Sequence, residues 1–291
     1  MIEARSTRAT RLVATAYRRG WLPPRGYGKL FSSTPASWWG GPQAIAQTAV
    51  GDLVVKVRDP GAQHLLAFGA LADEHRESAF MRRLLGRVGV FVDVGATYGW
   101  YSRMAWSCNG EAMVVAIEAN PELLPLLGQN VGPGATVVHA MVTDQAGEGI
   151  LHLCDNSTMS SATREVGVPV VVPAVTIDEI AGRFRCQPDL IKCDVEGGEM
   201  AVLRGAARVR SHSTPPLWLI EVYERYLLDG GESYEALHAE FSRFGPMEYF
   251  CPDERGQLVS LQRFEELRGS DRFNVVAVPA ARLGLIADLI S

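Results

Sequence analysis

Residues 93–99 (Asp-Val-Gly-Ala-Thr-Tyr-Gly) place a carboxylate and two glycines directly after the apolar residues 90–92. Such a turn between a strand and a helix can bind a phosphate through free backbone N–H groups, or its glycines can serve only the backbone angles. The phosphate motifs GxGxxG and GxxxxGK[ST] are both absent. Asp93 would repel a pyrophosphate and attract an ammonium or sulfonium group. The turn therefore favours a cationic nucleoside ligand, which points to S-adenosylmethionine.

A second acid follows at the distance that a nucleoside ligand would require. Glu118 closes the apolar run at 113–117 and lies 23 residues after Gly95. An acid about 20 residues beyond a glycine turn, at the tip of the next strand, is placed to bind the two hydroxyls of a ribose. Taken alone, a glutamate at a strand end is usually a solvated loop residue. Together with the turn, it indicates a nucleoside site.

Three more acids surround a Gly-Gly turn after the apolar run at 190–193: Asp194, Glu196 and Glu199. Carboxylates can act as a general base, bind a cationic ligand or hold a metal ion. An acid at the start of a helix is favoured by the helix dipole, and this accounts for Glu199 but not for Asp194. Asp194, Glu196 and Glu221 could together hold Mg²⁺, but we favour a site without metal.

The segments around these residues alternate between strand and helix. Apolar runs at 90–95, 113–119, 136–142, 189–195 and 217–223 predict strands, and most are followed by a helical pattern. Repeated alternation predicts a parallel, doubly wound α/β sheet with right-handed crossovers, which binds ligands at the carboxyl ends of its strands. Later segments (247–252, 257–261 and 273–279) predict further strands with an antiparallel edge. Before the sheet, residues 46–69 suggest a hairpin that turns at Asp59-Pro60-Gly61.

Charge divides the chain unevenly. The 291 residues carry a net charge of −5, yet residues 1–50 hold seven lysines and arginines against Glu3 alone. We expect a basic N-terminal helix and connector over 1–50 and the main domain over 51–291. An arginine-rich start is compatible with a transit peptide, a membrane-surface helix or a partner-binding arm, and a solvated helix is the interpretation we favour. The acidic remainder argues against nucleic-acid binding.

The location expected from composition is the cytoplasm. No apolar run approaches the roughly 20 residues that span a bilayer, so no transmembrane segment is expected. The five cysteines form no CxxC pair and are too few for a disulfide framework, which favours a reducing compartment.

The motifs together resemble the FkbM-type methyltransferases. The resemblance rests on FVDVGATYGWYS, AIEANP, LIKCDVEGGEMAVLRGA and LIEVYE, in this order, and extends over about residues 50–280. It implies the class I methyltransferase fold, a Rossmann-like sheet of seven strands with one antiparallel strand. It also implies S-adenosylmethionine as cofactor and O-methylation of a hydroxyl on a small molecule, sugar or lipid.

Carried over by position, the resemblance implies a set of cofactor-binding residues. Asp93, Gly95 and Gly99 correspond to the cofactor turn, Glu118 to the ribose-binding acid, and Asp194 to a residue near the transferred methyl group. The full set is Asp93, Gly95, Ala96, Thr97, Tyr98, Gly99, Glu118, Ala119 and Asp194.

Two positions depart from the family pattern. Thr97 and Tyr98 replace an amide and an aliphatic residue in the turn, and Tyr223 stands where the family often has a histidine. A nearby sulfonium would lower the pKa of Asp194 and make it a poor base. We therefore expect Glu196 or Glu221 to orient or deprotonate the acceptor, and Asp194, Glu196 and Glu221 are the candidate catalytic residues. The alternatives are a nicotinamide-dependent oxidoreductase and a non-catalytic nucleotide-binding scaffold.

Overall fold

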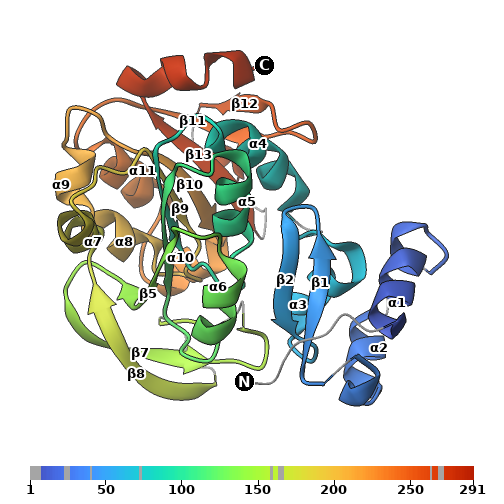
Figure 1. Cartoon of the computed structure of the whole chain (residues 1–291). Coiled ribbons are helices and arrows are strands. Elements are labelled where there is room, and N and C mark those ends of the chain that lie inside the picture. The colour runs from blue at the N-terminus through green and yellow to red at the C-terminus, as the bar shows by residue number, and fades with distance from the viewer. Residues whose placement is uncertain are drawn as a thin grey trace.

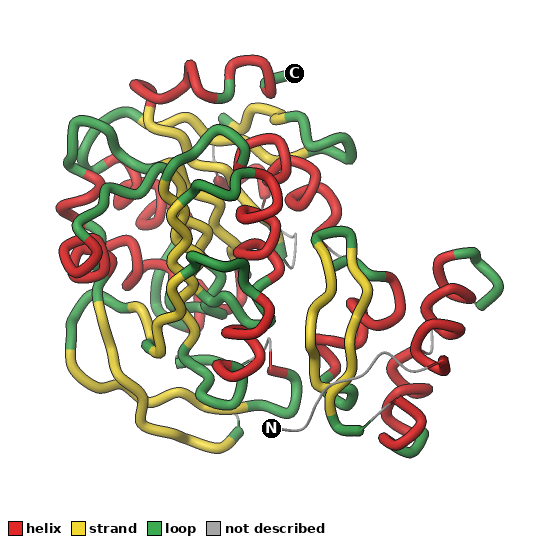
Figure 2. Tube along the Cα trace, viewed as in Figure 1, coloured by secondary structure: helices red, strands yellow, loops and turns green. Residues whose placement is uncertain are grey.

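The computed structural model describes residues 8–22, 27–39, 41–71, 74–157, 160–162, 167–262, 264–267 and 272–291. Its main feature is an eight-stranded sheet with the strand order β12-β11-β13-β10-β9-β3-β4-β5 (Figures 1 and 2). In chain order the strands are β3 (Val90–Val94), β4 (Met113–Glu118), β5 (Thr136–His139), β9 (Leu190–Cys193), β10 (Leu217–Val222), β11 (Met247–Pro252), β12 (Leu258–Leu261) and β13 (Phe273–Pro279).

The strand directions confirm the predicted fold class. β5, β4, β3, β9 and β10 run parallel, and β13 pairs antiparallel with β10. β11 pairs antiparallel with β13, so it again runs in the direction of the central strands. These seven strands are the mostly parallel sheet with one antiparallel strand that was expected. β12 is an eighth strand, which pairs antiparallel with β11 and extends the sheet at its edge.

Both faces of the sheet are buried, which explains why its central strands are almost uniformly apolar. Alternate residues of β3 belong to different cores: Phe91 packs on one side, Val92 and Val94 on the other. Helices α4 (His75–Leu85), α5 (Trp100–Cys108) and α6 (Leu124–Asn130) cover the first face. Helices α7 (Ile177–Phe184), α8 (Glu199–Arg204) and α11 (Tyr234–Ser242) cover the second (Figure 1).

The remaining helices that follow the strands of the main sheet are short. They are α9 (Ala207–Arg210) after α8, α10 (Glu224–Asp229) after β10, and the 3₁₀ helices η4 (Phe264–Leu267), η5 (Ala280–Leu285) and η6 (Ala287–Leu289). Among the helices that the structure describes, none has the length and apolarity needed to cross a bilayer.

The N-terminal elements form a separate layer outside α5 and α6 (Figure 1). They are α1 (Arg8–Arg18), α2 (Tyr27–Ser33), η1 (Ala36–Trp39), the antiparallel strands β1 (Gln43–Thr48) and β2 (Gly51–Lys56), and α3 (Pro60–Phe68). The expected domain boundary between residues 50 and 51 falls inside this hairpin, where Thr48 pairs with Gly51. The division of the chain at this point stays a prediction.

The hairpin predicted for residues 46–69 does not turn where we expected. The chain reverses at residues 49–50, and Asp59-Pro60-Gly61 instead begins α3. Asp59 caps the helix, because its Oδ1 accepts a hydrogen bond from the Gly61 N–H at 3.0 Å, and Pro60 takes the first helical position. Asp-Pro-Gly is compatible with both a turn and a helix start, so the local sequence could not separate them.

A small three-stranded sheet lies beyond the carboxyl ends of the central strands. It has the order β6-β8-β7 and consists of β6 (Met141–Val142), β7 (Gly147–Leu153) and β8 (Val168–Val175). β7 and β8 pair antiparallel over their full length, and Figure 1 shows them below the main sheet. Ala140, Met141, Val142, Thr143 and Leu151 from this region line the cavity described next.

Candidate functional site

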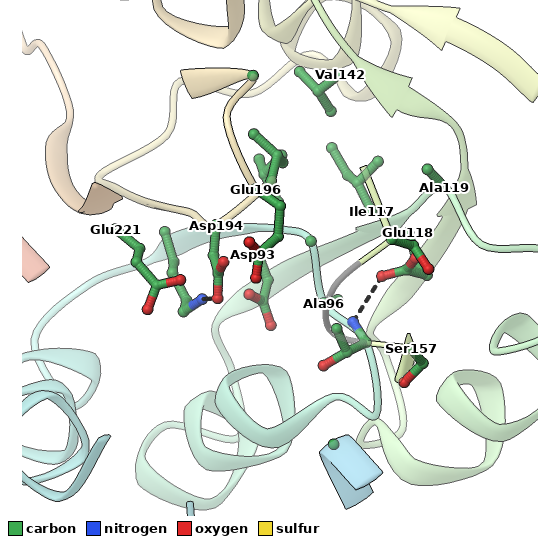
Figure 3. Close-up of a pocket in the computed structure, with 18 of the residues that line it drawn as sticks. Asp93, Ala96, Ile117, Glu118, Ala119, Val142, Ser157, Asp194, Glu196 and Glu221 are labelled. Carbon is green, nitrogen blue, oxygen red and sulfur yellow. Dashed lines mark hydrogen bonds and ion pairs between the residues drawn. The ribbon is translucent and has the colours of Figure 1, made fainter. Parts of the chain in front are cut away.

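A cavity of about 580 Å³ lies at the carboxyl ends of β3, β4, β9 and β10. This is the edge where open α/β sheets bind ligands, and the volume is typical of pockets for cofactors and small molecules. The predicted site residues that line it, most of them labelled in Figure 3, are Asp93, Gly95, Ala96, Thr97, Tyr98, Glu118, Ala119, Asp194, Glu196 and Glu221. Of the predicted residues, only Gly99 lies outside this lining.

The two glycines of the turn have structural reasons to be glycine. Gly95 has φ +77°, and a Cβ there would lie 1.9 Å from the backbone oxygen of Asp194, so the ends of β3 and β9 approach too closely for a side chain. Gly99 has φ +80° and caps the N-terminus of α5. The turn therefore depends on glycine at both positions.

The backbone N–H groups of the turn are largely used within the protein. Those of Gly95 and Ala96 donate to the Ile117 carbonyl at 3.0 Å, and that of Gly99 donates to the Ala96 carbonyl at 2.7 Å. The N–H of Thr97 donates to Glu118 Oε2 at 2.8 Å. These four groups cannot also bind a phosphate, which agrees with the absence of the phosphate motifs from the sequence.

Glu118 is held in one orientation at the end of β4. Its Oε2 accepts the Thr97 N–H, and its Oε1 accepts the Asn120 N–H at 2.7 Å. Burial raises the pKa of Glu118 to about 6, although these backbone hydrogen bonds oppose the shift. The carboxylate is thus fixed on the cavity wall with lone pairs left to accept hydrogen bonds from a ligand.

Asp93 is buried in the floor of the cavity. Its Oδ2 accepts a hydrogen bond from the Ser102 hydroxyl at 2.6 Å, whereas its Oδ1 has no hydrogen-bond partner in the described part of the chain. Burial raises the pKa of Asp93, against the opposing charge of Lys192. A buried carboxylate oxygen without a partner is costly, so this atom is suited to a positively charged or hydrogen-bonding ligand.

The three predicted catalytic acids come together at one wall of the cavity (Figure 3). Carboxylate oxygens of Asp194, Glu196 and Glu221 lie within 4.8 Å of one another. Two cations that the sequence analysis missed neutralise part of this charge. Lys192 Nζ lies 2.8 Å from Asp194 Oδ2, and Arg272 Nε lies 2.5 Å from Glu221 Oε1. Because these cations contact two of the three carboxylates, the cluster differs from an open metal site.

The acids of this cluster are driven toward different protonation states. Burial opposes the ionisation of Asp194, but the charge of Lys192 and the hydrogen bond with Glu221 outweigh it and lower the pKa of Asp194. Burial, followed by the charge of Asp194, raises the pKa of Glu221 well above its usual range, against the opposing charge of Arg272. A closely spaced carboxyl pair of this kind holds one proton between its members.

Glu199 has the structural role that its position predicted. It begins α8, and its Oε1 accepts hydrogen bonds from the N–H groups of Val195 and Gly197 at 3.4 and 3.0 Å. Burial raises its pKa to about 7.

Glu196 has φ +56°, and its carbonyl accepts a hydrogen bond from the Ser161 hydroxyl at 2.8 Å. Ser161 belongs to the polar stretch 156–163, of which residues 158, 159 and 163 lie outside the described residues.

Tyr98 does not present its hydroxyl to the ligand. The hydroxyl donates to Asp59 Oδ2 at 2.5 Å. The same carboxylate accepts the Ser157 N–H at 3.1 Å and the Ser157 hydroxyl, besides capping α3. Asp59 therefore joins α3, the glycine turn and the segment at Ser157, and its contacts with Tyr98 and Ser157 are buried. We call Asp59, Tyr98 and Ser157 the Asp59 cluster.

We predict that Thr97→Asn raises stability. Thr97 has φ +48°, a conformation that is unfavourable for a β-branched residue and more accessible to asparagine. Thermal unfolding should show a gain of about 1 kcal/mol. Thr97→Val keeps the branched Cβ and serves as the matched control, with no gain expected. Equal stabilities of the Asn and Val variants would contradict strain at this position.

We predict that Tyr98→Phe destabilises the protein by about 1–2 kcal/mol, because it removes a buried donor to a carboxylate. Chemical denaturation measures the loss. Tyr17→Phe is the control, since Tyr17 packs among apolar residues and its hydroxyl makes no hydrogen bond within the described part of the chain. If the stability lost in Tyr98→Phe is no larger than that lost in Tyr17→Phe, the Asp59 cluster contributes nothing to the stability of the fold.

The chain was compared with solved structures and with curated proteins. Solved structures that resemble the fold include precorrin-6y C5,15-methyltransferase from Geobacter metallireducens (14% identity, TM-score 0.40, 72% of this chain and 89% of that chain). A second is a putative O-methyltransferase from Klebsiella pneumoniae (13% identity, TM-score 0.39, 72% of this chain and 82% of that chain). A third is a SAM-dependent methyltransferase from Agrobacterium tumefaciens (10% identity, TM-score 0.44, 82% of this chain and 70% of that chain). No curated protein matches the sequence.

The sequence itself identifies the family. The model of the methyltransferase FkbM domain matches residues 93–245, which is more than half of the chain and includes the glycine turn, Glu118 and the carboxylate cluster. The protein therefore belongs to the FkbM methyltransferase family and is an S-adenosylmethionine-dependent methyltransferase.

Proposed function

We propose that the protein transfers the methyl group of S-adenosylmethionine to a hydroxyl oxygen of a small molecule, sugar or lipid. The observation that carries the proposal is the pair of Asp194 and Glu221, which line the cavity with carboxylate oxygens within 4.8 Å of each other. The environment shifts the pKa values of the two acids in opposite directions. An alcohol is a weak nucleophile that must lose its proton during the transfer, so it benefits from a carboxylate of raised basicity.

The cavity fits the cofactor. The unpartnered Asp93 Oδ1 offers a negative charge to the amino acid part of the cofactor, and the fixed carboxylate of Glu118 offers acceptors to the ribose hydroxyls. The N–H groups of the turn are occupied, which suits a ligand without phosphate. The cofactor supplies a methyl group on a positively charged sulfur, which the surrounding carboxylates attract.

Positioning should provide most of the rate enhancement. Orientation of two reactants can contribute about 7–11 kcal/mol to lowering a barrier. A general base adds a rate factor of about 10²–10⁴. In our proposal the residues that line the cavity hold the acceptor oxygen in line with the methyl group, and Glu196 orients the acceptor from the same wall.

Glu221 is the proposed proton acceptor. Lys192 keeps Asp194 ionised, and an ionised aspartate of low pKa takes a proton weakly. Glu221 has the higher pKa and is therefore the stronger base once it has lost its own proton. A bound cation nearby favours that loss. Arg272 then stabilises the carboxylate through its contact with Glu221 Oε1.

We predict that Glu221→Gln lowers kcat/KM by about 10²–10⁴-fold. In the unchanged protein kcat/KM should rise with pH, because Glu221 has a raised pKa and must ionise to accept a proton. The variant should lose this rise. Glu77→Gln is a matched control, since Glu77 is also buried and of raised pKa but does not line the cavity. A variant at Glu221 with full turnover and the same pH profile would refute this role.

The acceptor can be found by mass spectrometry. Extracts of metabolites, glycans and lipids are incubated with the protein and S-adenosylmethionine, and products that gain one methylene in mass are sought. Fragmentation of the product then locates the methyl group. A methylated oxygen supports the proposal, whereas a methylated nitrogen or carbon overturns O-methylation. EDTA should leave the rate unchanged, and a loss that Mg²⁺ restores would favour the metal interpretation of Asp194, Glu196 and Glu221.

We predict that cofactor affinity falls as pH decreases through about 6, the pKa of Glu118. Below that pH the carboxyl group is protonated and offers fewer acceptors to the ribose hydroxyls. Above it, the ionised form binds. Calorimetry across pH 5–8 measures the effect, which should be absent in Glu118→Gln with its uniformly weak binding. An unchanged pH dependence in that variant would assign the effect to another group.

A further inference from the structure

The helix α1 has one face packed on the protein and one face left in solvent. The residues of the packed face are Thr10, Ala14 and Tyr17, which are buried and follow a helical spacing. α1 packs against α3. On the opposite face, Arg8, Arg11 and Leu12 are exposed, and Arg19 follows one turn after Thr15. The spacing of 3, 4 and 7 residues places these side chains on a common surface.

Large apolar side chains stand among these arginines. Leu12 is 69% exposed and Trp21, just after the helix, is 67% exposed. Trp38, in the neighbouring η1, is 60% exposed, whereas the adjacent Trp39 is buried against Phe31. The Arg19 guanidinium lies 5.3 Å from the centre of the Trp21 ring. η1 contacts α1, so these side chains lie in neighbouring elements. A group of exposed apolar side chains bordered by polar residues marks an interaction site.

Over residues 8–50 the side-chain charge has one sign. Residues 8–50 contain no aspartate or glutamate. Arg8, Arg11, Arg19 and Lys29 are exposed, and none of them forms an ion pair with a carboxylate in the described part of the chain. The surface therefore offers several cations to an anionic partner. We call Arg8, Arg11, Leu12, Arg19, Trp21 and Trp38 the α1 surface.

We propose that the α1 surface docks on the headgroups of an anionic lipid bilayer. Docked in this way, Leu12, Trp21 and Trp38 would enter the membrane interface and the arginines would lie among the headgroups, the division seen in interfacial helices. Tryptophan is enriched at that depth, and each basic residue near an anionic leaflet strengthens binding. A nucleic acid would match the arginines but would leave Leu12 in water, so the bilayer accounts for the whole surface.

Helix α3 lies between α1 and the reaction cavity and contacts both. α3 packs against α1, and its residues Pro60, Gly61, His64 and Leu65 line the cavity. The hydroxyl of Tyr27, on α2, contacts Nε2 of His64. The N-terminal layer is thus part of the cavity wall, and docking would place α1 between that wall and the lipid. The inference does not depend on which acceptor is methylated.

Vesicle sedimentation tests the proposal with the full chain. We expect binding to vesicles of phosphatidylcholine mixed with phosphatidylglycerol, weak binding to phosphatidylcholine alone, and release at high salt. Arg8→Gln combined with Arg11→Gln should lower the partition coefficient about 25-fold, since each basic residue contributes about fivefold. Tryptophan fluorescence should shift to shorter wavelength on binding, and Trp21→Phe with Trp38→Phe should abolish the shift.

Matched variants separate a specific surface from general stickiness. Leu12→Ser should weaken binding, whereas Val171→Ser should not, although Val171 on β8 is 67% exposed. Arg19→Gln should weaken it, whereas Arg183→Gln should not, although Arg183 also lies 5.3 Å from an aromatic ring centre, that of Phe184. Calorimetry with S-adenosylmethionine should show unchanged cofactor binding in all of these variants.

Several results would overturn the proposal. One is vesicle binding that does not depend on phosphatidylglycerol, and another is an equal loss in the Leu12 and Val171 variants. A third is failure to bind vesicles while the α1 surface binds RNA or buries itself in a dimer, as detected by gel shift or by ultracentrifugation. None of these outcomes bears on methyl transfer itself, so the two proposals fail independently.

Discussion

The buried ammonium group of Lys192 is the interaction on which the arrangement of the cavity depends. Lys192 projects from β9, is 4% exposed and lies against Asp194 and over the ring of Tyr101. Burial alone would lower its pKa, but Asp194 and three further acids outweigh that effect and keep it charged. One lysine thus makes it possible to hold several carboxylates at the end of an apolar sheet, where isolated charges would be costly.

The same balance makes the members of the cluster chemically different. Burial and the charge of Asp194 raise the pKa of Glu221. Its ion pair with Arg272 opposes this shift, but Arg272 is shared with Glu74, which lies 3.4 Å away. Asp194 has its pKa lowered by Lys192 and by the hydrogen bond with Glu221, so it ionises first. Two carboxyl groups of similar intrinsic pKa are separated in this way into one that holds charge and one that can exchange a proton. A cluster of acids alone would not provide this difference.

The sequence predicted those parts of the site that follow directly from strand ends. Asp93, Glu118 and Asp194 each end or follow an apolar run, and parallel strands bring such positions to one edge. The sequence did not predict Arg272 or Asp59, because each reaches the site through packing of distant segments. Lys192 carried a signal that was not used, namely a charge in the middle of a buried strand. The prediction of a hairpin turn at Asp59 was wrong, because the start of a capped helix has the same local residues.

Thr97 and Tyr98, the two departures from the family turn, have linked consequences. Thr97 is held at positive φ although its side chain disfavours it, which costs of order 1–2 kcal/mol. Its N–H fixes Glu118, so the strained backbone is also the one that orients the predicted ribose acceptor. Tyr98, the next residue, reaches Asp59 and ties the turn to α3 and Ser157. The free energy contributed by the hydrogen bond from Tyr98 to a buried carboxylate is large enough to offset the strain at Thr97. The unusual pair therefore preserves the geometry of the turn by adding a contact on its other side, toward the N-terminal layer.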